Sequence, residues 1–187
     1  MYTITFYSFK GGVGRTMSLV NVAAYLASIG RSVLMVDFDL EAPGLSTFDL
    51  YDQSQNPKGI LEYVTQFSQE KKSPDIREFI VSCQISTPQN FGENTISGDV
   101  YLMPAGKTGA DYESKLAALN WKHLYEQDAG YLMIEDMKAQ WKEYLNPDYV
   151  LVDSRTGHSD VSGICTRQLP DSVLILFFPN KQNLISL

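Results

Sequence analysis

The sequence predicts a doubly wound, mostly parallel α/β sheet in a three-layer α/β/α arrangement. Three observations lead to this prediction. Short apolar runs such as Ser32–Val36 and Tyr149–Asp153 alternate with helical patterns, as expected for strands that are covered on both faces. A glycine-rich turn, Phe9–Thr16, joins the first strand to the first helix. Polar and acidic residues follow several strand ends, which is the edge where open parallel sheets bind ligands.

The first 44 residues predict a strand–helix–strand unit. Tyr2–Ser8 is rich in β-branched and aromatic residues, which favours a strand. Thr16–Ser28 places apolar residues at helical spacing, and Gly30 follows where the helix is expected to end. Ser32–Val36 is the second strand. We expect the first strand to lie beside the strand Tyr149–Asp153.

The rest of the chain alternates in the same way. Helices are expected at Gly59–Phe67, Lys115–Glu126 and Leu132–Leu145, with strands at Val100–Pro104, Tyr149–Asp153 and Ser172–Phe178. Residues 75–81 fit either a helix or a strand. Residues 84–99 carry many turn-forming side chains and predict a loop or hairpin. Residues 154–163 predict a polar loop that enters a helix by Val161.

Composition limits the possible functions. A chain of 187 residues is long enough for one domain with a sizeable core, so we expect a single domain over 1–187. The net charge of −7 argues against nucleic-acid binding through a broad basic surface. Cys83 and Cys165 have no metal-ligand spacing, which favours reduced thiols in a cytoplasmic protein. We see no signal peptide and no membrane anchor.

The chemistry is concentrated in three places that follow strands. Phe9–Thr16 nearly matches the phosphate-binding pattern G-x-x-x-x-G-K-[ST], but Phe9 replaces the first glycine and Arg15 replaces the lysine. Backbone N–H groups in such a turn form a cradle for anions. The Thr16 hydroxyl and the Asp153 carboxylate are suitable ligands for Mg²⁺, and Asp37 or Asp39 could position an attacking water. Alone, each feature could be an ordinary turn; together they favour a nucleotide site.

These residues resemble a known family. Lys10–Thr16 (KGGVGRT) resembles the deviant phosphate loop KGGxGK[ST] of the ParA/MinD-type P-loop ATPases, in the variant that carries arginine. Val33–Asp39 with Ala42-Pro43-Gly44 is similar to the second motif and first switch of that family. Val150–Gly157 is similar to its Walker B strand and second switch, and Val100–Gly106 to a strand and turn before its central helices.

The resemblance implies an ATP-dependent homodimer that binds Mg²⁺ and signals to a protein partner or a linked effector domain. Lys10 would reach the partner's nucleotide, and Arg15 would contact the β- and γ-phosphates. Thr16 and Asp153 would serve Mg²⁺, with Asp37 near the metal, and Asp39 would position water. The residues implied to bind ATP are Lys10, Gly11, Gly12, Val13, Gly14, Arg15, Thr16 and Met17. The family continues beyond the strand like Ser172–Phe178, so we expect the chain to lack C-terminal elements.

Arginine at position 15 leaves the activity open. It is bulkier than lysine and binds in a bidentate way, so we expect ATP binding with slow hydrolysis. One alternative is a non-catalytic nucleotide-sensing or scaffold domain. Others are a phosphotransferase like the bacterial tyrosine kinases and an amidotransferase-type synthase. The sequence does not identify the cellular process or the partner, and it distinguishes ATP from GTP only through the resemblance.

Overall fold

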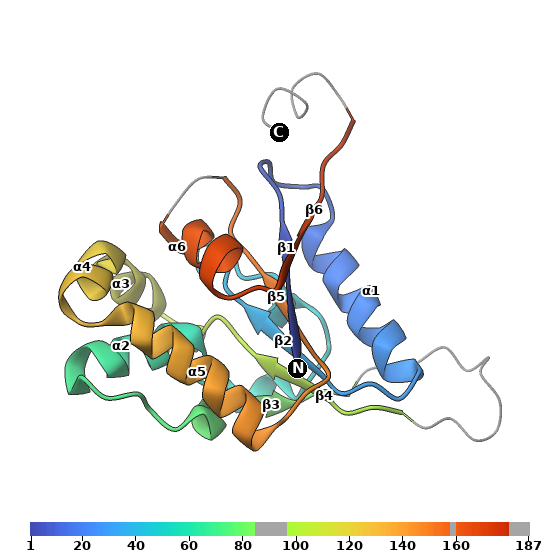
Figure 1. Ribbon diagram of the computed structural model, residues 1–187, viewed down its shortest axis with the longest axis horizontal. Helices are drawn as coiled ribbons and strands as arrows, with labels where there is room; N and C mark the ends of the chain where they lie inside the picture. Colours follow the sequence, from blue (N-terminus) through green and yellow to red (C-terminus); the bar gives the residue numbers. More distant parts are fainter. Residues whose placement is uncertain (85–96, 158–159, 180–187) are drawn as a thin grey trace.

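The computed structural model describes residues 1–84, 97–157 and 160–179, and it forms three layers (Figure 1). Helix α1 (Arg15–Ser28) lies on one side of a central sheet. Helices α2 (Ile60–Glu70) and α5 (Gly130–Tyr144) lie on the other side. The α/β/α layering predicted from the sequence is therefore confirmed.

Within the described ranges the sheet has six strands in the order β3-β4-β2-β5-β1-β6, and of these only β3 runs antiparallel to its neighbour. The strands are β1 (Tyr2–Tyr7), β2 (Val33–Asp37), β3 (Val81–Ser82), β4 (Val100–Met103), β5 (Tyr149–Asp153) and β6 (Ser172–Ile175). Strands β1 and β5 pair in parallel, from Tyr2 with Tyr149 to Phe6 with Asp153, as predicted. This order places the carboxyl ends of β2, β5 and β1 next to one another.

Strand β2 explains why the apolar runs are continuous. Val33 and Met35 pack with α1 residues in one hydrophobic cluster, whereas Leu34 and Val36 pack in a second cluster with α2 and α5. All four side chains are fully buried. A strand between two helical layers needs apolar side chains on both faces.

The remaining helices cover the α2 side of the sheet. The shorter ones are α3 (Asp111–Ala118), α4 (Trp121–Gln127) and α6 (Asp160–Gly163), which continues into a π-helical turn at Ile164–Gln168. Single 3₁₀ turns are found at Leu45–Thr47, Gln53–Gln55 and Ile76–Phe79. No helix in the described ranges is long and apolar enough to cross a membrane.

The structure corrects one predicted helix and shortens a strand. The single helix expected at Lys115–Glu126 is wrong, because Leu119 is extended and the Asn120 side chain accepts a hydrogen bond from the His123 N–H to cap α4. Residues 75–81 contain a 3₁₀ turn and then β3. The predicted strand Ser172–Phe178 ends at Ile175. Most of the expected loop at 84–99 lies outside the described residues.

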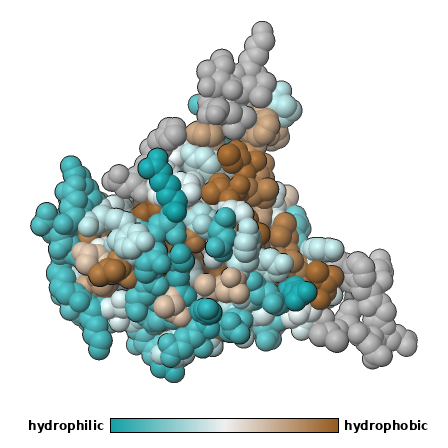
Figure 2. Space-filling view, in the orientation of Figure 1, coloured by the Kyte–Doolittle hydropathy of each residue, from teal (hydrophilic) through white to brown (hydrophobic). Residues whose placement is uncertain are grey.

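Strand β6 is the exposed edge of the sheet next to β1. Its large apolar side chains Val173, Leu174 and Ile175 are all more than one third exposed. Beyond the strand Phe177 and Phe178 are exposed to the same degree, whereas Leu176 is partly buried. Figure 2 shows hydrophobic residues gathered around this part of the molecule. The opposite edge, β3, has only two residues and is antiparallel. The hydrophobic surface is therefore concentrated at the β6 edge.

Candidate functional site

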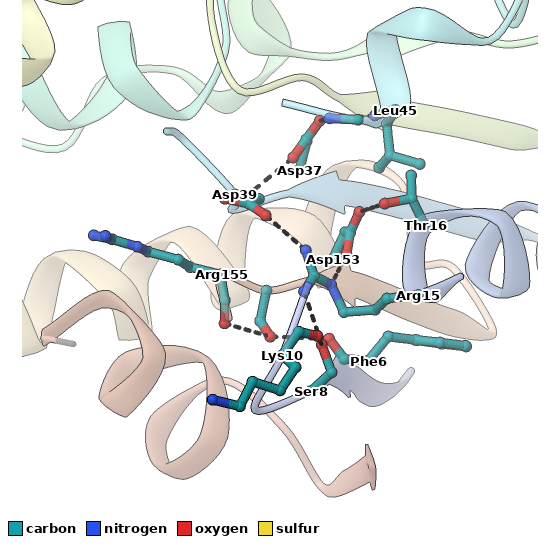
Figure 3. Close-up of polar contacts among 12 residues, drawn as sticks. Phe6, Ser8, Lys10, Arg15, Thr16, Asp37, Asp39, Leu45, Asp153 and Arg155 are labelled. Carbon is teal, nitrogen blue, oxygen red and sulfur yellow. Dashed lines mark hydrogen bonds and ion pairs between the residues drawn. The ribbon is translucent and has the colours of Figure 1, made fainter. Parts of the chain in front are cut away.

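Three loops meet at one edge of the sheet (Figure 3). The first runs from β1 to α1, the second follows β2, and the third follows β5. Their strands are neighbours and run parallel, so their carboxyl ends lie together. Asp37 and Asp153 are paired positions at the ends of β2 and β5. The sheet therefore brings together the three segments that the sequence singled out.

The loop before α1 has the backbone that its glycines permit. Gly12 and Gly14 have φ angles of 75° and 81°, in the left-handed region that side chains disfavour. A Cβ atom added to Gly11, Gly12 or Gly14 would meet nothing within 4 Å. Gly12 and Gly14 are thus required by backbone conformation and not by packing, and the loop borders open space where a ligand could approach.

Arg15 is the centre of the polar network. Its side chain is only 8% exposed. Nε lies 2.5 Å from Oδ1 of Asp153, and Nη2 lies 2.6 Å from Oδ2 of Asp39. Nη1 donates a hydrogen bond of 3.2 Å to Oγ of buried Ser8. Ser8 was not predicted from the sequence as a site residue. Only its position between β1 and the glycine-rich loop indicated a role.

Asp153 also accepts a hydrogen bond from Thr16. The Thr16 hydroxyl lies 2.6 Å from Oδ2 of Asp153, so both oxygens of this fully buried carboxylate have partners. The two residues predicted to serve Mg²⁺ are therefore in direct contact, and a hydroxyl beside a carboxylate is a donor set that suits this ion. Gly44 packs closely against them, since a Cβ at this position would lie 2.8 Å from the Thr16 hydroxyl oxygen.

Asp37 is fully buried and organises the loop that follows β2. Its carboxylate accepts hydrogen bonds from the backbone N–H groups of Asp39, Gly44 and Leu45, at 3.2, 3.1 and 3.0 Å. Burial, followed by the negative charge of Asp153, raises the pKa of Asp37 to about 8, although the backbone donors oppose this shift. Asp37 thus holds the loop in shape beside Asp153.

Asp39 lies at the end of the Arg15 guanidinium and is 7% exposed. Burial raises the pKa of its carboxyl above the ordinary value, while the charge of Arg15 opposes the rise. Among the described residues, no group of three or more His, Cys, Asp or Glu side chains is arranged to hold a metal ion. Arg15 instead bridges the carboxylates of Asp39 and Asp153.

The other predicted site residues lie around the loop. Lys10 is exposed, and its side chain points away from the carboxylates (Figure 3). Met17 is 61% exposed in the first turn of α1, and Val13 is half-buried. Backbone N–H groups at the start of a helix attract anions in general, and the anion cradle predicted at α1 stays a prediction.

The loops after β2 and β5 are also joined directly. Arg155 donates from Nη1 to Oε1 of Glu41 in an ion pair on the surface. No functional role was predicted for Glu41 from the sequence. The ion pair connects the two segments predicted to be switches. His158, which follows Gly157 in the loop after β5, lies outside the described residues.

Comparisons with known proteins identify the family of this chain. The family model for the AAA domain named AAA_31 matches residues 1–177. The chromosome-partitioning ATPase Soj of Treponema pallidum is 44% identical over 57 residues, which are 26% of this chain and 22% of Soj.

Two solved structures share the fold. A Cyanothece McdA–ATP complex aligns with a TM-score of 0.68 at 19% identity, over 100% of this chain and 60% of McdA. The septum site-determining protein MinD of Pyrococcus horikoshii, complexed with Mg-ADP, aligns with a TM-score of 0.62 at 19% identity, over 98% of this chain and 60% of MinD. The chain thus spans less than two thirds of the length of these proteins. With the family match over nearly its whole length, the chain belongs to the AAA_31 family of AAA domains, and it shares the fold of the ParA/MinD-type P-loop proteins.

Proposed function

We propose that this chain binds ATP with Mg²⁺ at the Arg15 site and hydrolyses it slowly as a nucleotide-switched dimer. The observation that supports this most strongly is the meeting of Arg15, Thr16, Asp39 and Asp153 beside a glycine-rich loop. These residues supply a cation, a hydroxyl and two carboxylates, which together suit a phosphate chain with its metal ion.

The loop would bind the phosphates mainly through its backbone. The loop borders open space at Gly11, Gly12 and Gly14, at the amino end of α1, where the helix dipole favours negative charge. Thr16 and Asp153 would hold Mg²⁺, which neutralises phosphate charge when it is bound. Asp37 would support this site by fixing the loop from Asp39 to Leu45.

Hydrolysis would depend on Asp39. Its carboxylate is nearly buried and would orient the attacking water once Arg15 no longer occupies it. Arg15 would turn toward the β- and γ-phosphates, which can replace both of its carboxylate partners. Because this rearrangement must precede chemistry, and because the bulky guanidinium alters phosphate placement, we expect slow turnover.

Dimer formation would involve Lys10. This side chain is exposed and directed away from its own carboxylates, as expected for a residue that contacts the nucleotide of a second copy. The Arg155–Glu41 ion pair would link the two switch loops, so that nucleotide state could be passed to a protein partner or a linked effector domain. We propose one P-loop domain over 1–187 that acts in the cytoplasm and does not itself bind nucleic acid.

A second candidate is a nucleotide sensor that binds ATP without hydrolysing it. The ion pairs of Arg15 favour this candidate, because they occupy the carboxylates that catalysis requires. A tyrosine-kinase-like phosphotransferase and an amidotransferase-type synthase remain further alternatives. Hydrolysis and autophosphorylation assays on one sample separate the ATPase, the sensor and the kinase.

The test of the ATPase proposal compares turnover of the wild type with Arg15→Lys. We expect measurable Mg²⁺-dependent release of phosphate, faster in the lysine variant, and a larger particle size with ATP. Arg77→Lys serves as the control, because this arginine forms an exposed ion pair with Asp75 away from the site. Equal turnover in the wild type and Arg15→Lys would refute the slowing role of Arg15. No phosphate release with intact ATP binding would favour the sensor.

A further inference from the structure

We propose that Arg15 is the built-in counter-cation of the nucleotide-free site, and that Mg²⁺ and phosphate must together displace it from Asp153 and Asp39. This inference rests on the proposed nucleotide site and adds a device that keeps the site closed. Arg15 and the metal ion are, in this account, alternative partners of the same carboxylates.

The closed arrangement uses the shape of the guanidinium. Nε contacts Asp153 at 2.5 Å and Nη2 contacts Asp39 at 2.6 Å, so two edges of one planar group bridge two loops (Figure 3). Nη1 is held by Ser8 at 3.2 Å. A lysine has a single nitrogen and cannot offer this fixed fork to two carboxylates. Arginine at this position therefore gives the chain a bridge that the usual loop sequence lacks.

Burial makes the bridge costly to open without replacement partners. Arg15 is 8% exposed, Asp39 is 10% exposed at the side chain, and Asp153 is fully buried. Removing one member of a buried ion pair leaves an uncompensated charge, which is strongly destabilising. Mg²⁺ alone could take Asp153 but would leave Nε of buried Arg15 without its carboxylate. Nucleotide alone could take the guanidinium but would leave Asp39 and Oδ1 of Asp153 without their cation.

The metal site is closed from a second direction as well. The Thr16 hydroxyl, the other residue proposed to hold Mg²⁺, donates to Oδ2 of Asp153 while Arg15 occupies Oδ1. A divalent ion at Asp153 would also lie close to the positive guanidinium and be repelled by it. Metal and nucleotide are thus expected to bind with strong positive coupling. Bound Mg²⁺ replaces Arg15 at the carboxylates, and bound phosphate replaces the carboxylates at Arg15, so each ligand raises the affinity for the other.

The test measures the bridge without any catalytic readout. A double-mutant cycle on unfolding free energy uses wild type, Arg15→Lys, Asp39→Asn and the double variant, with and without Mg²⁺ and the slowly hydrolysed analogue ATPγS. In nucleotide-free protein we expect the two substitutions to be non-additive, because they act on one contact. With Mg²⁺ and ATPγS, we expect the coupling to disappear. Arg77→Lys with Asp75→Asn is the matched control for an exposed pair.

A binding experiment completes the test. We expect Mn²⁺ alone to leave the melting temperature of the wild type unchanged, and Asp39→Asn to bind Mg·ATPγS about tenfold more tightly because one partner of the bridge is gone. Additive substitutions in the nucleotide-free protein would overturn the inference even if ATP binds. Coupling that persists unchanged with bound ATPγS would also overturn it. If ATPγS does not bind at all while the coupling is present, the proposed function fails and the bridge remains only a structural ion pair.

Discussion

Arg15 Nε lies 2.5 Å from Oδ1 of Asp153, and this buried contact joins the first residue of α1 to the last residue of β5. The two residues are 138 positions apart in the sequence. They meet because β1 and β5 are neighbouring parallel strands. The contact connects the proposed phosphate loop with the proposed metal ligand, so changes at either residue should affect both stability and ligand binding.

Asp153→Asn should destabilise the protein strongly. The variant removes one of the two carboxylates that pair with buried Arg15 and leaves only Asp39, and breaking a buried ion pair typically costs about 3 kcal/mol or more of unfolding free energy. Urea unfolding measures the change. Asp75→Asn removes the acid of an exposed ion pair and should leave the midpoint nearly unchanged. Equal effects of the two substitutions would show that the Arg15–Asp153 contact contributes no more than a surface pair.

Gly14→Ala should destabilise the loop, whereas Gly11→Ala should not. Gly14 has a φ of 81°, and alanine in the left-handed region costs about 1 kcal/mol. Neither added Cβ meets another atom within 4 Å, so packing is the same in both cases. The melting temperatures of the two variants test this difference. If Gly11→Ala lowers the melting temperature as much as Gly14→Ala, backbone strain is not the reason for the glycine.

Local patterns predicted the elements that position the site. The continuous apolar runs of β2 and β5 indicated strands inside a parallel sheet, because such strands bury side chains on both faces. The family motifs then identified Arg15, Thr16 and Asp153 as members of one site. Their contacts depend on strand order and on side-chain rotamers, which local sequence does not specify. For the same reason Ser8 and Glu41 were not found.

The missed break between α3 and α4 has a local cause. The sequence Leu119-Asn120 interrupts an otherwise helical pattern, and asparagine is a preferred N-cap. The signal was present but competed with a regular run of apolar residues on both sides. Helical periodicity therefore predicted helix in this segment but neither where it begins nor where it is divided.

Gly44→Ala should weaken metal-dependent nucleotide binding while leaving metal-independent binding unchanged. The new Cβ would lie 2.8 Å from the Thr16 hydroxyl oxygen and 2.9 Å from its methyl carbon, so Thr16 must move away from Asp153. Titrating Mg²⁺ at a fixed ATPγS concentration measures the effect. Gly163→Ala is the control, since its Cβ would meet nothing within 4 Å. An unchanged Mg²⁺ requirement in Gly44→Ala would contradict a role for Thr16 in holding the ion.

Thr5→Val should raise the stability of the protein by about 1 kcal/mol. Thr5 is fully buried in β1, and its hydroxyl has no hydrogen-bond partner among the described residues. Valine has nearly the same shape and favours strands. Thr65→Val is the comparison, because the Thr65 hydroxyl donates to the Leu61 carbonyl at 2.7 Å and this bond would be lost. A lower melting temperature for Thr5→Val would mean that the hydroxyl has a stabilising partner.

Cys83 should react slowly with alkylating reagents in the native protein. Burial raises the pKa of its thiol to about 12, so very little thiolate is present at pH 8. The alkylation rate should therefore rise about tenfold per pH unit from pH 8 to 11. The rate of a free thiol stops rising above its pKa of about 8.5. Mass spectrometry of a Cys165→Ser variant follows Cys83 alone. A native rate equal to the rate in urea would contradict burial of this thiol.

The central claim is that the Arg15 site binds ATP through Mg²⁺, and calorimetric titration with ATPγS tests it most directly. The account predicts saturable binding of one nucleotide per chain with Mg²⁺ present. It predicts much weaker binding in EDTA and in Asp153→Asn. Equal binding heats for the wild type in Mg²⁺, the wild type in EDTA and Asp153→Asn would contradict a magnesium-dependent ATP site. So would the absence of any binding heat in the folded wild type with Mg²⁺.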